Sequence, residues 1–295
     1  MKYLILIDID GTLENDKNVV SPKTIKAIEK ITNQGHIVVL ASGRARYSVI
    51  KVKNQIHSSN YIITSNGAEI YNTFNNLIVY GSYLPIKELL QICNYASKLK
   101  IKIKIAKGNY EYINYPKENN YQTIINDFKT IINQNIKQVM FISQNNKLKK
   151  LKSYIKKMSN IKIIRESTYN QTPWFSIVNQ GASKGNMLKI LADKLNIPIK
   201  NTIAIGNDYN DLSMINSAND SYAMANANNI VKTHAKYITY SNNDDGVAIA
   251  LEKIMQEKNI DWCFILIIDQ LVHYIYSMYQ YFGILPYHLR LTMFP

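Results

Sequence analysis

The most constraining feature of the sequence is a short apolar run, Tyr3–Ile7, that leads directly into Asp8–Thr12, which reads Asp-Ile-Asp-Gly-Thr. An all-apolar run of this length is typical of a strand buried on both faces of a parallel sheet. Open α/β sheets bind ligands at the carboxyl ends of their strands, where Asp8 and Asp10 fall. Two neighbouring carboxylates repel each other, and a divalent cation such as Mg²⁺ relieves that repulsion. The pattern therefore indicates a site at the end of the first strand.

Strands and helices alternate over the first 81 residues and again after about residue 176. Ser21 followed by Pro22 predicts the start of a helix, and Gly35 its end. Asn66-Gly67 is a turn signal that predicts a hairpin. Further strands are expected at Ile37–Ala41, Tyr61–Thr64, Thr202–Ile205, Tyr222–Ala225 and Tyr237–Thr239, and further helices after Ser183 and over Gly246–Met255. This alternation predicts an α/β fold with a parallel sheet.

Residues 82–176 interrupt that alternation with a different pattern of apolar and polar residues. We expect helices near Lys87–Lys98 and Leu148–Met158, a strand at Ile101–Ile105, and tyrosine-rich loops over Tyr110–Tyr121. The segment is predicted to be an inserted α/β domain, with residues 1–81 and 177–256 forming the main domain. Residues 257–295 form an extension to which the sequence assigns no role.

Three further segments carry polar residues at positions suited to a ligand. Ser42 and Gly43 follow a predicted strand, where a hydroxyl and free amides can hold a phosphate oxygen. Lys184 is the first residue of a predicted helix, where a positive charge opposes the helix dipole. Helix formation therefore gives no local reason for a lysine at this position. The loop Gly206–Asp211 follows another strand and is rich in oxygen ligands, with Asn207, Asp208, Asn210 and Asp211.

The order of these four segments resembles the four signature motifs of the haloacid dehalogenase superfamily, and in particular its Cof-type hydrolases. The resemblance covers nearly all of residues 1–256, and Ser65–Ala68 also matches a stretch typical of the Cof-type branch. It implies a Rossmann-like core with the larger type of α/β cap inserted between the second and third motifs. Specificity would then come from cap loops, with Tyr110, Tyr112, Tyr115 and Trp174 as candidate contributors.

The resemblance also implies a phosphatase mechanism. Asp8 would attack the phosphorus of a phosphate monoester and form an aspartyl-phosphate. Asp10 would protonate the leaving alcohol and later take a proton from water. Lys184 would steady Asp8 and offset charge on the phosphoryl group. The phosphate would be bound by Ser42, Gly43, Lys184 and Asn210.

The metal site departs from the family pattern. The resemblance implies Mg²⁺ held by Asp8, by the backbone carbonyl of Asp10 and by the fourth motif. That motif usually begins Gly-Asp, but here Asn207 stands at the aspartate position and Asp208 follows one residue later. Either residue could complete the site, and an uncharged amide should bind the metal more weakly than a carboxylate. Asp211 is a further metal-site candidate, although anchoring the loop or a metal-bound water fits it better.

Composition narrows the possible partners. The net charge of +14 invites a nucleic-acid interpretation, but all except four of the 35 basic residues are lysine, and the densest run lies on a predicted helix face. Two widely separated cysteines exclude a disulfide scaffold and suit the cytoplasm. The N-terminal segment does not resemble a signal peptide. We therefore expect a small phosphorylated metabolite, with a sugar phosphate first, rather than nucleic acid.

Residues 257–295 are apolar and aromatic but interrupted by polar residues such as Asp261 and Asp269. A membrane span is therefore not expected, and docking on the core or a homodimer contact is favoured. Two alternatives to the phosphatase remain open. One is a phosphate-ligand binding protein with a weakened metal site, and the other is a phosphomutase or phosphotransferase of the same fold.

Overall fold

The computed structural model describes residues 2–133, 135–169 and 171–258. Contacts divide the chain into a unit of residues 1–250 and a second unit of residues 251–295. Helix α8 (Gly246–Lys258) runs across that division. The predicted extension and its dimer contact lie outside the described residues, except for residues 257 and 258.

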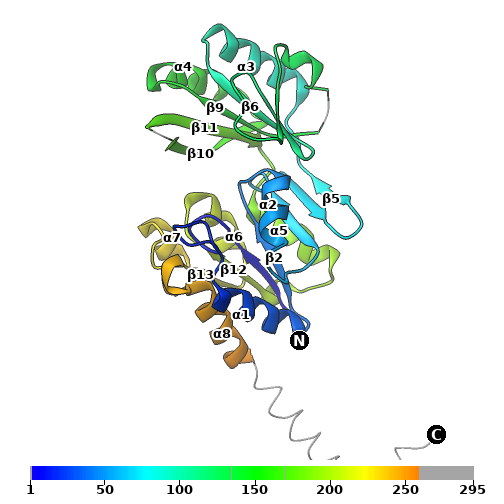
Figure 1. Ribbon diagram of the computed structural model, residues 1–295, viewed down its shortest axis with the longest axis vertical. Coiled ribbons are helices and arrows are strands. Elements are labelled where there is room, and N and C mark those ends of the chain that lie inside the picture. The colour runs from blue at the N-terminus through cyan, green and yellow to red at the C-terminus, as the bar shows by residue number, and fades with distance from the viewer. Residues whose placement is uncertain (1, 134, 170, 259–295) are drawn as a thin grey trace, which may run out of the picture. The chain divides into compact units, whose positions relative to one another are not determined.

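The larger sheet has eight strands in the order β14-β13-β12-β1-β2-β3-β4-β5 (Figure 1). The six strands from β14 to β3 pair in parallel, and β4 and β5 add an antiparallel edge. This confirms the predicted α/β fold with a parallel core. The strands are β1 (Leu4–Ile7), β2 (Ile37–Ala41), β3 (Tyr61–Thr64), β4 (Glu69–Asn72), β5 (Leu77–Gly81), β12 (Thr202–Gly206), β13 (Asp220–Ala223) and β14 (Tyr237–Ile238).

Helices connect the parallel strands of this sheet. Ser21 accepts a hydrogen bond from the Thr24 amide at the start of α1, and Gly35 follows its end with a positive φ of 84°. The five helices are α1 (Pro22–Asn33), α2 (Arg46–Lys53), α5 (Lys184–Lys194), α6 (Leu212–Ser217) and α7 (Asn229–His234), joined by the 3₁₀ turns η2 (Ile199–Asn201), η3 (Tyr209–Asp211) and η4 (Asn242–Asp244). Among the described residues, no helix has the length and apolar character needed to cross a membrane.

The second sheet has six strands in the order β10-β11-β9-β6-β7-β8. Helices α3 (Ile86–Lys98) and α4 (Asn145–Ile155) lie on one face of this sheet (Figure 1). They share one hydrophobic core with it, which includes Phe141 and Phe175. The strands are β6 (Lys102–Lys107), β7 (Tyr110–Ile113), β8 (Gln122–Ile124), β9 (Ile136–Ile142), β10 (Ile161–Tyr169) and β11 (Thr172–Asn179), and the turn η1 is Phe128–Thr130. All of these elements lie within residues 86–179.

Two details of the inserted segment differ from the sequence prediction. The tyrosine-rich segment 110–121 is not all loop, because β7 (Tyr110–Ile113) pairs with β6 and alternates inward and outward residues. The boundary expected at 176/177 falls inside β11, whose pairing with β9 continues to Val178. The contact division falls only at 250/251, so the core and cap limits stay predictions.

A buried ionic cluster joins elements of the two sheets. Glu69 on β4 accepts hydrogen bonds from Arg46 on α2 (Nε to Oε1, 2.8 Å) and from Lys137 on β9 (Nζ to Oε1, 3.3 Å). Lys137 also donates to the Gly108 carbonyl at 2.7 Å, and Arg46 lies over the Tyr71 ring. Burial lowers the pKa of Lys137 to about 8 despite the opposing attraction of Glu69. One carboxylate therefore compensates two buried cations.

We expect Glu69→Gln to lower the free energy of unfolding by about 3 kcal/mol, because Arg46 and Lys137 would remain buried without a counter-charge. The change preserves side-chain size, so packing is disturbed little. Urea denaturation of the variant beside the wild type measures the difference. As a control, Lys236→Gln breaks an exposed pair with Asp220 and should cost under about 1 kcal/mol. Equal losses in the two variants would contradict the prediction.

Candidate active site

The parallel strands bring the predicted motifs to one edge of the sheet. β1 lies between β12 and β2, and Ile7 is aligned with both Ile205 and Leu40. The Asp8 amide continues the ladder by donating to the Ile205 carbonyl at 3.0 Å. The loops that follow these three strands therefore start side by side, as expected for carboxyl ends of parallel strands.

Lys184 lies between two buried carboxylates. Its Nζ is 2.5 Å from Asp8 Oδ1 and 2.6 Å from Asp211 Oδ1. Lys184 and Asp211 are fully buried, and Asp8 is 3% exposed. The lysine opens helix α5, whose cap Ser183 accepts from the Asn186 amide, so the helix start fixes the position of the ammonium group. One lysine and two aspartates thus form a single buried cluster.

The charges of this cluster shift the pKa of its members. Burial, followed by repulsion from Asp211, raises the pKa of Asp8 to about 7 even though Lys184 lowers it. Burial alone would lower the pKa of Lys184, but attraction to Asp211 and Asp8 outweighs it and raises that pKa. Lys184 therefore stays charged. Ionisation of Asp8 in the metal-free protein, in contrast, costs more free energy than ionisation of an exposed aspartate.

Asp211 also holds the loop of the fourth motif. Its Oδ2 accepts hydrogen bonds from the backbone amides of Asn207 (2.9 Å) and Asp208 (3.0 Å). Asp208 and Asp211 form a capping box around the turn η3, in which Asp208 accepts from the Tyr209 amide. Both Asp211 oxygens thus accept hydrogen bonds from protein donors. These contacts are those of a residue that anchors the loop.

Asn207 lies against the first motif. Its Oδ1 accepts a hydrogen bond from Thr12 Oγ1 at 3.0 Å. A Cβ placed on Gly11, which has a φ of 71°, would lie only 2.5 Å from Asn207 Nδ2. Glycine is favoured at position 11 by this positive φ, and a larger residue there would displace the Asn207 side chain. The contacts bring an amide oxygen of the fourth motif beside the loop that begins at Asp8.

The donor set fits Mg²⁺, although it is weakly charged. Among the described residues, none donates a hydrogen bond to Asp8 Oδ2, so this oxygen is available to a hard cation or to a phosphorus atom. The amide oxygen of Asn207 and the carboxylate of Asp208 are further hard donors of the kind that Mg²⁺ accepts. No group of three His, Cys, Asp or Glu suited to a metal occurs in the described part of the chain. Water and backbone ligands would have to supply the rest of the coordination.

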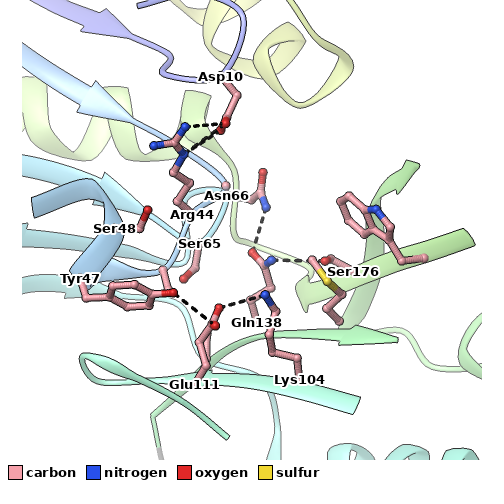
Figure 2. A pocket seen from close by; sticks show the side chains of 15 residues that line it. Asp10, Arg44, Tyr47, Ser48, Ser65, Asn66, Lys104, Glu111, Gln138 and Ser176 are labelled. Atoms are coloured by element: carbon pink, nitrogen blue, oxygen red, sulfur yellow. Dashed lines mark hydrogen bonds and ion pairs between the residues drawn. The ribbon is translucent and has the colours of Figure 1, made fainter. Parts of the chain in front are cut away.

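The Asp10 side chain contacts Arg44 (Figure 2). Arg44 Nη2 lies 2.8 Å from Asp10 Oδ1, and Nε lies 3.2 Å from each carboxylate oxygen. Arg44 also binds the buried Glu14 through both Nη atoms. Burial alone would lower the pKa of Arg44, but its hydrogen bonds to Asp10 and Glu14 and the attraction of both carboxylates outweigh burial and raise that pKa. From the sequence, neither Arg44 nor Glu14 was assigned a role.

The predicted phosphate-binding residues are linked through Asn66. Ser42 is fully buried, its Oγ accepts from the Arg44 amide at 3.1 Å, and its carbonyl accepts from the Asn66 amide at 3.0 Å. Asn210 donates from Nδ2 to Asn66 Oδ1 at 2.8 Å. A Cβ on Gly43 would approach the Asn66 amide group to 2.9 Å. Ser42, Gly43 and Asn210 therefore surround one asparagine from the stretch typical of the Cof-type branch.

A pocket of about 290 Å³ opens beside Asp10 and Arg44 (Figure 2). Of the four aromatic residues singled out in the sequence, only Trp174 is among its lining residues. Most of the cap side chains in the pocket carried no motif that would have identified them. The lining residues are Asp10, Gly43, Arg44, Ala45, Tyr47, Ser48, Ser65, Asn66, Lys104, Ala106, Glu111, Gln138, Met140, Trp174 and Ser176.

Residues 5–251 match the family model described as haloacid dehalogenase-like hydrolase. The chain belongs to this family. The motif order and the parallel sheet had led to the same assignment.

Individual relatives agree with the family match. The chain is 27% identical to phosphatase YwpJ of Bacillus subtilis, over 85% of this chain and 99% of that protein. It is 29% identical to the 5-amino-6-(5-phospho-D-ribitylamino)uracil phosphatase YcsE of the same organism, over 84% and 94%. A haloacid dehalogenase-like hydrolase from Bacteroides thetaiotaomicron has a similar structure, with a TM-score of 0.77 and 30% identity over 86% of this chain and all of that one. This member of the haloacid dehalogenase-like hydrolases is thus a phosphatase.

Proposed function

We propose that the protein is a Mg²⁺-dependent phosphatase that hydrolyses the phosphate monoester of a small metabolite through an aspartyl-phosphate on Asp8. The observation that carries the proposal is the Asp8 carboxylate, in which Lys184 binds Oδ1 and no described residue donates to Oδ2. This arrangement leaves one oxygen free to attack phosphorus while the other is fixed by a buried ammonium group.

In the first step, Asp8 Oδ2 forms a bond to phosphorus and the bond from phosphorus to the leaving oxygen breaks. Asp10 gives its proton to that oxygen, so the product leaves as an alcohol. Lys184 and Ser42 bind the phosphoryl oxygens and offset their charge. When bound by Asp8, the Asp10 carbonyl and Asn207 or Asp208, Mg²⁺ supplies further charge compensation. In the second step, Asp10 removes a proton from the water that hydrolyses the aspartyl-phosphate.

Arg44 supports the proposed role of Asp10 by setting its position. Two guanidinium nitrogens hold the carboxyl group from one side, and Glu14 fixes the guanidinium in turn. A planar, doubly bonded contact restricts rotation more than a single hydrogen bond does. Asp10 is thereby kept at the pocket edge, where the leaving group would lie.

The pocket favours an uncharged, hydroxyl-bearing leaving group, as in a sugar phosphate. Each charged side chain in its lining is paired, Asp10 with Arg44 and Lys104 with Glu111 (3.2 Å). A second phosphate or a carboxylate on the substrate would have to compete for these cations. The volume lies near the lower end of ligand pockets, which suits a small metabolite. A relative that is named for a phosphate on a ribityl chain agrees with this class.

The first test is phosphate release from phenyl phosphate and from a panel of sugar phosphates, with Mg²⁺ or with a chelator. We expect release that requires Mg²⁺. If the wild type released phosphate from none of the substrates but still bound sugar phosphates, the result would favour the phosphate-ligand binding protein. An isomeric phosphate with little free phosphate would favour the phosphomutase.

The metal site is tested by Asn207→Asp. We expect the half-saturating Mg²⁺ concentration to fall about tenfold, because a carboxylate replaces a neutral amide beside Asp8. The matched variant Asp208→Asn retains the oxygen that accepts from the Tyr209 amide and should leave that concentration nearly unchanged if Asn207 is the ligand. A loss of Mg²⁺ affinity in Asp208→Asn, with no gain in Asn207→Asp, would assign the ligand to Asp208 instead.

A further inference from the structure

Two buried serine hydroxyls at the pocket have unused hydrogen-bonding capacity. Ser65 is 1% exposed, and its Oγ has no hydrogen-bond partner in the described part of the chain. Ser176 is fully buried, and its Oγ accepts from Gln138 Nε2 at 3.2 Å without donating to any described residue. Both residues line the pocket (Figure 2). Buried polar groups normally have at least one hydrogen-bond partner, so the Ser65 hydroxyl calls for an external one. The Ser176 hydroxyl has a donor to its oxygen but keeps its own proton available to an external acceptor.

A chain of side-chain amides determines the role of the Ser176 hydroxyl. Asn210 Nδ2 donates to Asn66 Oδ1 (2.8 Å), Asn66 Nδ2 donates to Gln138 Oε1 (2.9 Å), and Gln138 Nε2 donates to Ser176 Oγ. Every donor along this chain points from Asn210 toward Ser176, so Ser176 Oγ accepts a hydrogen bond. The Ser176 O–H group is then available to donate a hydrogen bond of its own. The chain runs from the predicted phosphate-binding loop on the larger sheet to β11 of the smaller one.

We propose that Ser65 and Ser176 are specificity-determining residues that hydrogen-bond hydroxyl oxygens of the leaving alcohol. This inference rests on the phosphatase activity proposed above and assigns its substrate contacts. The two serines come from different sheets, since Ser65 follows β3 and Ser176 lies on β11. A substrate with several hydroxyl groups can bind both, whereas an alkyl phosphate leaves Ser65 Oγ without a partner and the Ser176 hydroxyl without an acceptor for its proton.

The amide chain adds a second consequence for the same residues. Because Gln138 connects Ser176 to Asn66 and Asn210, the orientation of the leaving-group contact depends on the residue predicted to bind phosphate. Neighbouring dipoles in such a chain polarise one another. Gln138 is thus a positioning residue, and the recognition of the two halves of the substrate is linked through it.

The experiment compares two substrates of equal carbon number, a hexitol phosphate and hexyl phosphate, which differ only in their hydroxyl groups. We expect Ser65→Ala and Ser176→Ala each to lower the ratio of the two kcat/KM values about tenfold. Ser65 has a φ of 51°, so Ser65→Gly is tested as well, because glycine removes the hydroxyl without backbone strain. The control is Ser58→Ala, which removes the other unpartnered buried hydroxyl, one that does not line this pocket.

An unchanged ratio in Ser65→Gly and Ser176→Ala, or an equal shift in Ser58→Ala, overturns the inference. Failure of the proposed function gives a different result, in which the wild type releases phosphate from neither substrate. In that case calorimetric binding of the two phosphates to the wild-type protein replaces the kinetic ratio. A preference for the hexitol phosphate that both variants lose supports the assignment, and equal binding of the two phosphates contradicts it.

Discussion

Replacing Lys184 with methionine is expected to abolish phosphatase activity and to lower the free energy of unfolding by about 3–5 kcal/mol. The variant would leave Asp8 and Asp211 buried together without the ammonium group that now lies 2.5 and 2.6 Å from them. The two buried carboxyl groups would then have no cation between them. Methionine fills a similar volume, so the effect reports the charge rather than a cavity.

Urea denaturation and phosphate release measure the two parts of this prediction. Lys189→Met on the same helix is the matched control, because Lys189 is exposed and should be replaced at little cost. A stability loss near that of the control would show that Lys184 does not compensate the buried carboxylates. Retained activity would show that it does not bind the phosphoryl group.

Asp8→Asn is expected to abolish activity, by at least about a thousandfold, while it raises the free energy of unfolding of the metal-free protein by about 1–3 kcal/mol. The amide cannot form the aspartyl-phosphate. It also removes one of two carboxylates around Lys184, which leaves a neutral pair with Asp211. The two variants of this cluster should therefore both be inactive and yet differ in the sign of their stability change.

The stability difference between wild type and Asp8→Asn should depend on pH. The pKa of Asp8 is raised from 3.8 to about 7 by burial and by repulsion from Asp211. Between these values the folded protein binds a proton that the unfolded chain has lost, so the wild type loses stability as pH rises through this window. The advantage of the variant should be largest above pH 7 and should vanish near pH 4.

Denaturation in the presence of a chelator, at several pH values, measures this difference. Because both proteins share all other titrating groups, their difference isolates Asp8. A variant less stable than the wild type at high pH would contradict the charge account of the cluster. Wild-type activity in Asp8→Asn would instead remove Asp8 as the nucleophile.

The central strands were predictable because they are buried on both faces. β1, β2 and β3 consist of apolar residues with few exceptions, and Ile37–Ala41 and Tyr61–Thr64 have the predicted bounds. The elements outside these central strands were harder to predict from the sequence. β7 alternates in burial and carries the charged residue Glu111, and helix α2 lacks a side-chain cap at Ala45, so neither gave a strong local signal.

The site could be predicted only in part, because its contacts join residues far apart in the sequence. The four motifs identified the loops that meet, but local patterns do not specify which carboxylate accepts from Lys184. They also did not reveal that Arg44 binds both Asp10 and Glu14. In the sequence, Glu14 and Gln138 look like ordinary surface residues. Only the fold buries them and brings them to their hydrogen-bond partners Arg44 and Ser176.

The position of β1 between β2 and β12 has a consequence for folding. β1 is synthesised long before one of its two partners, Thr202–Gly206. The six-stranded sheet draws all its strands from residues 102–179, so its contacts close shorter loops. During synthesis the inserted segment can fold while β1, which leads into Asp8, still lacks one of its two neighbours. The unpaired apolar edge of β1 is then the part of the nascent chain most in need of protection from aggregation.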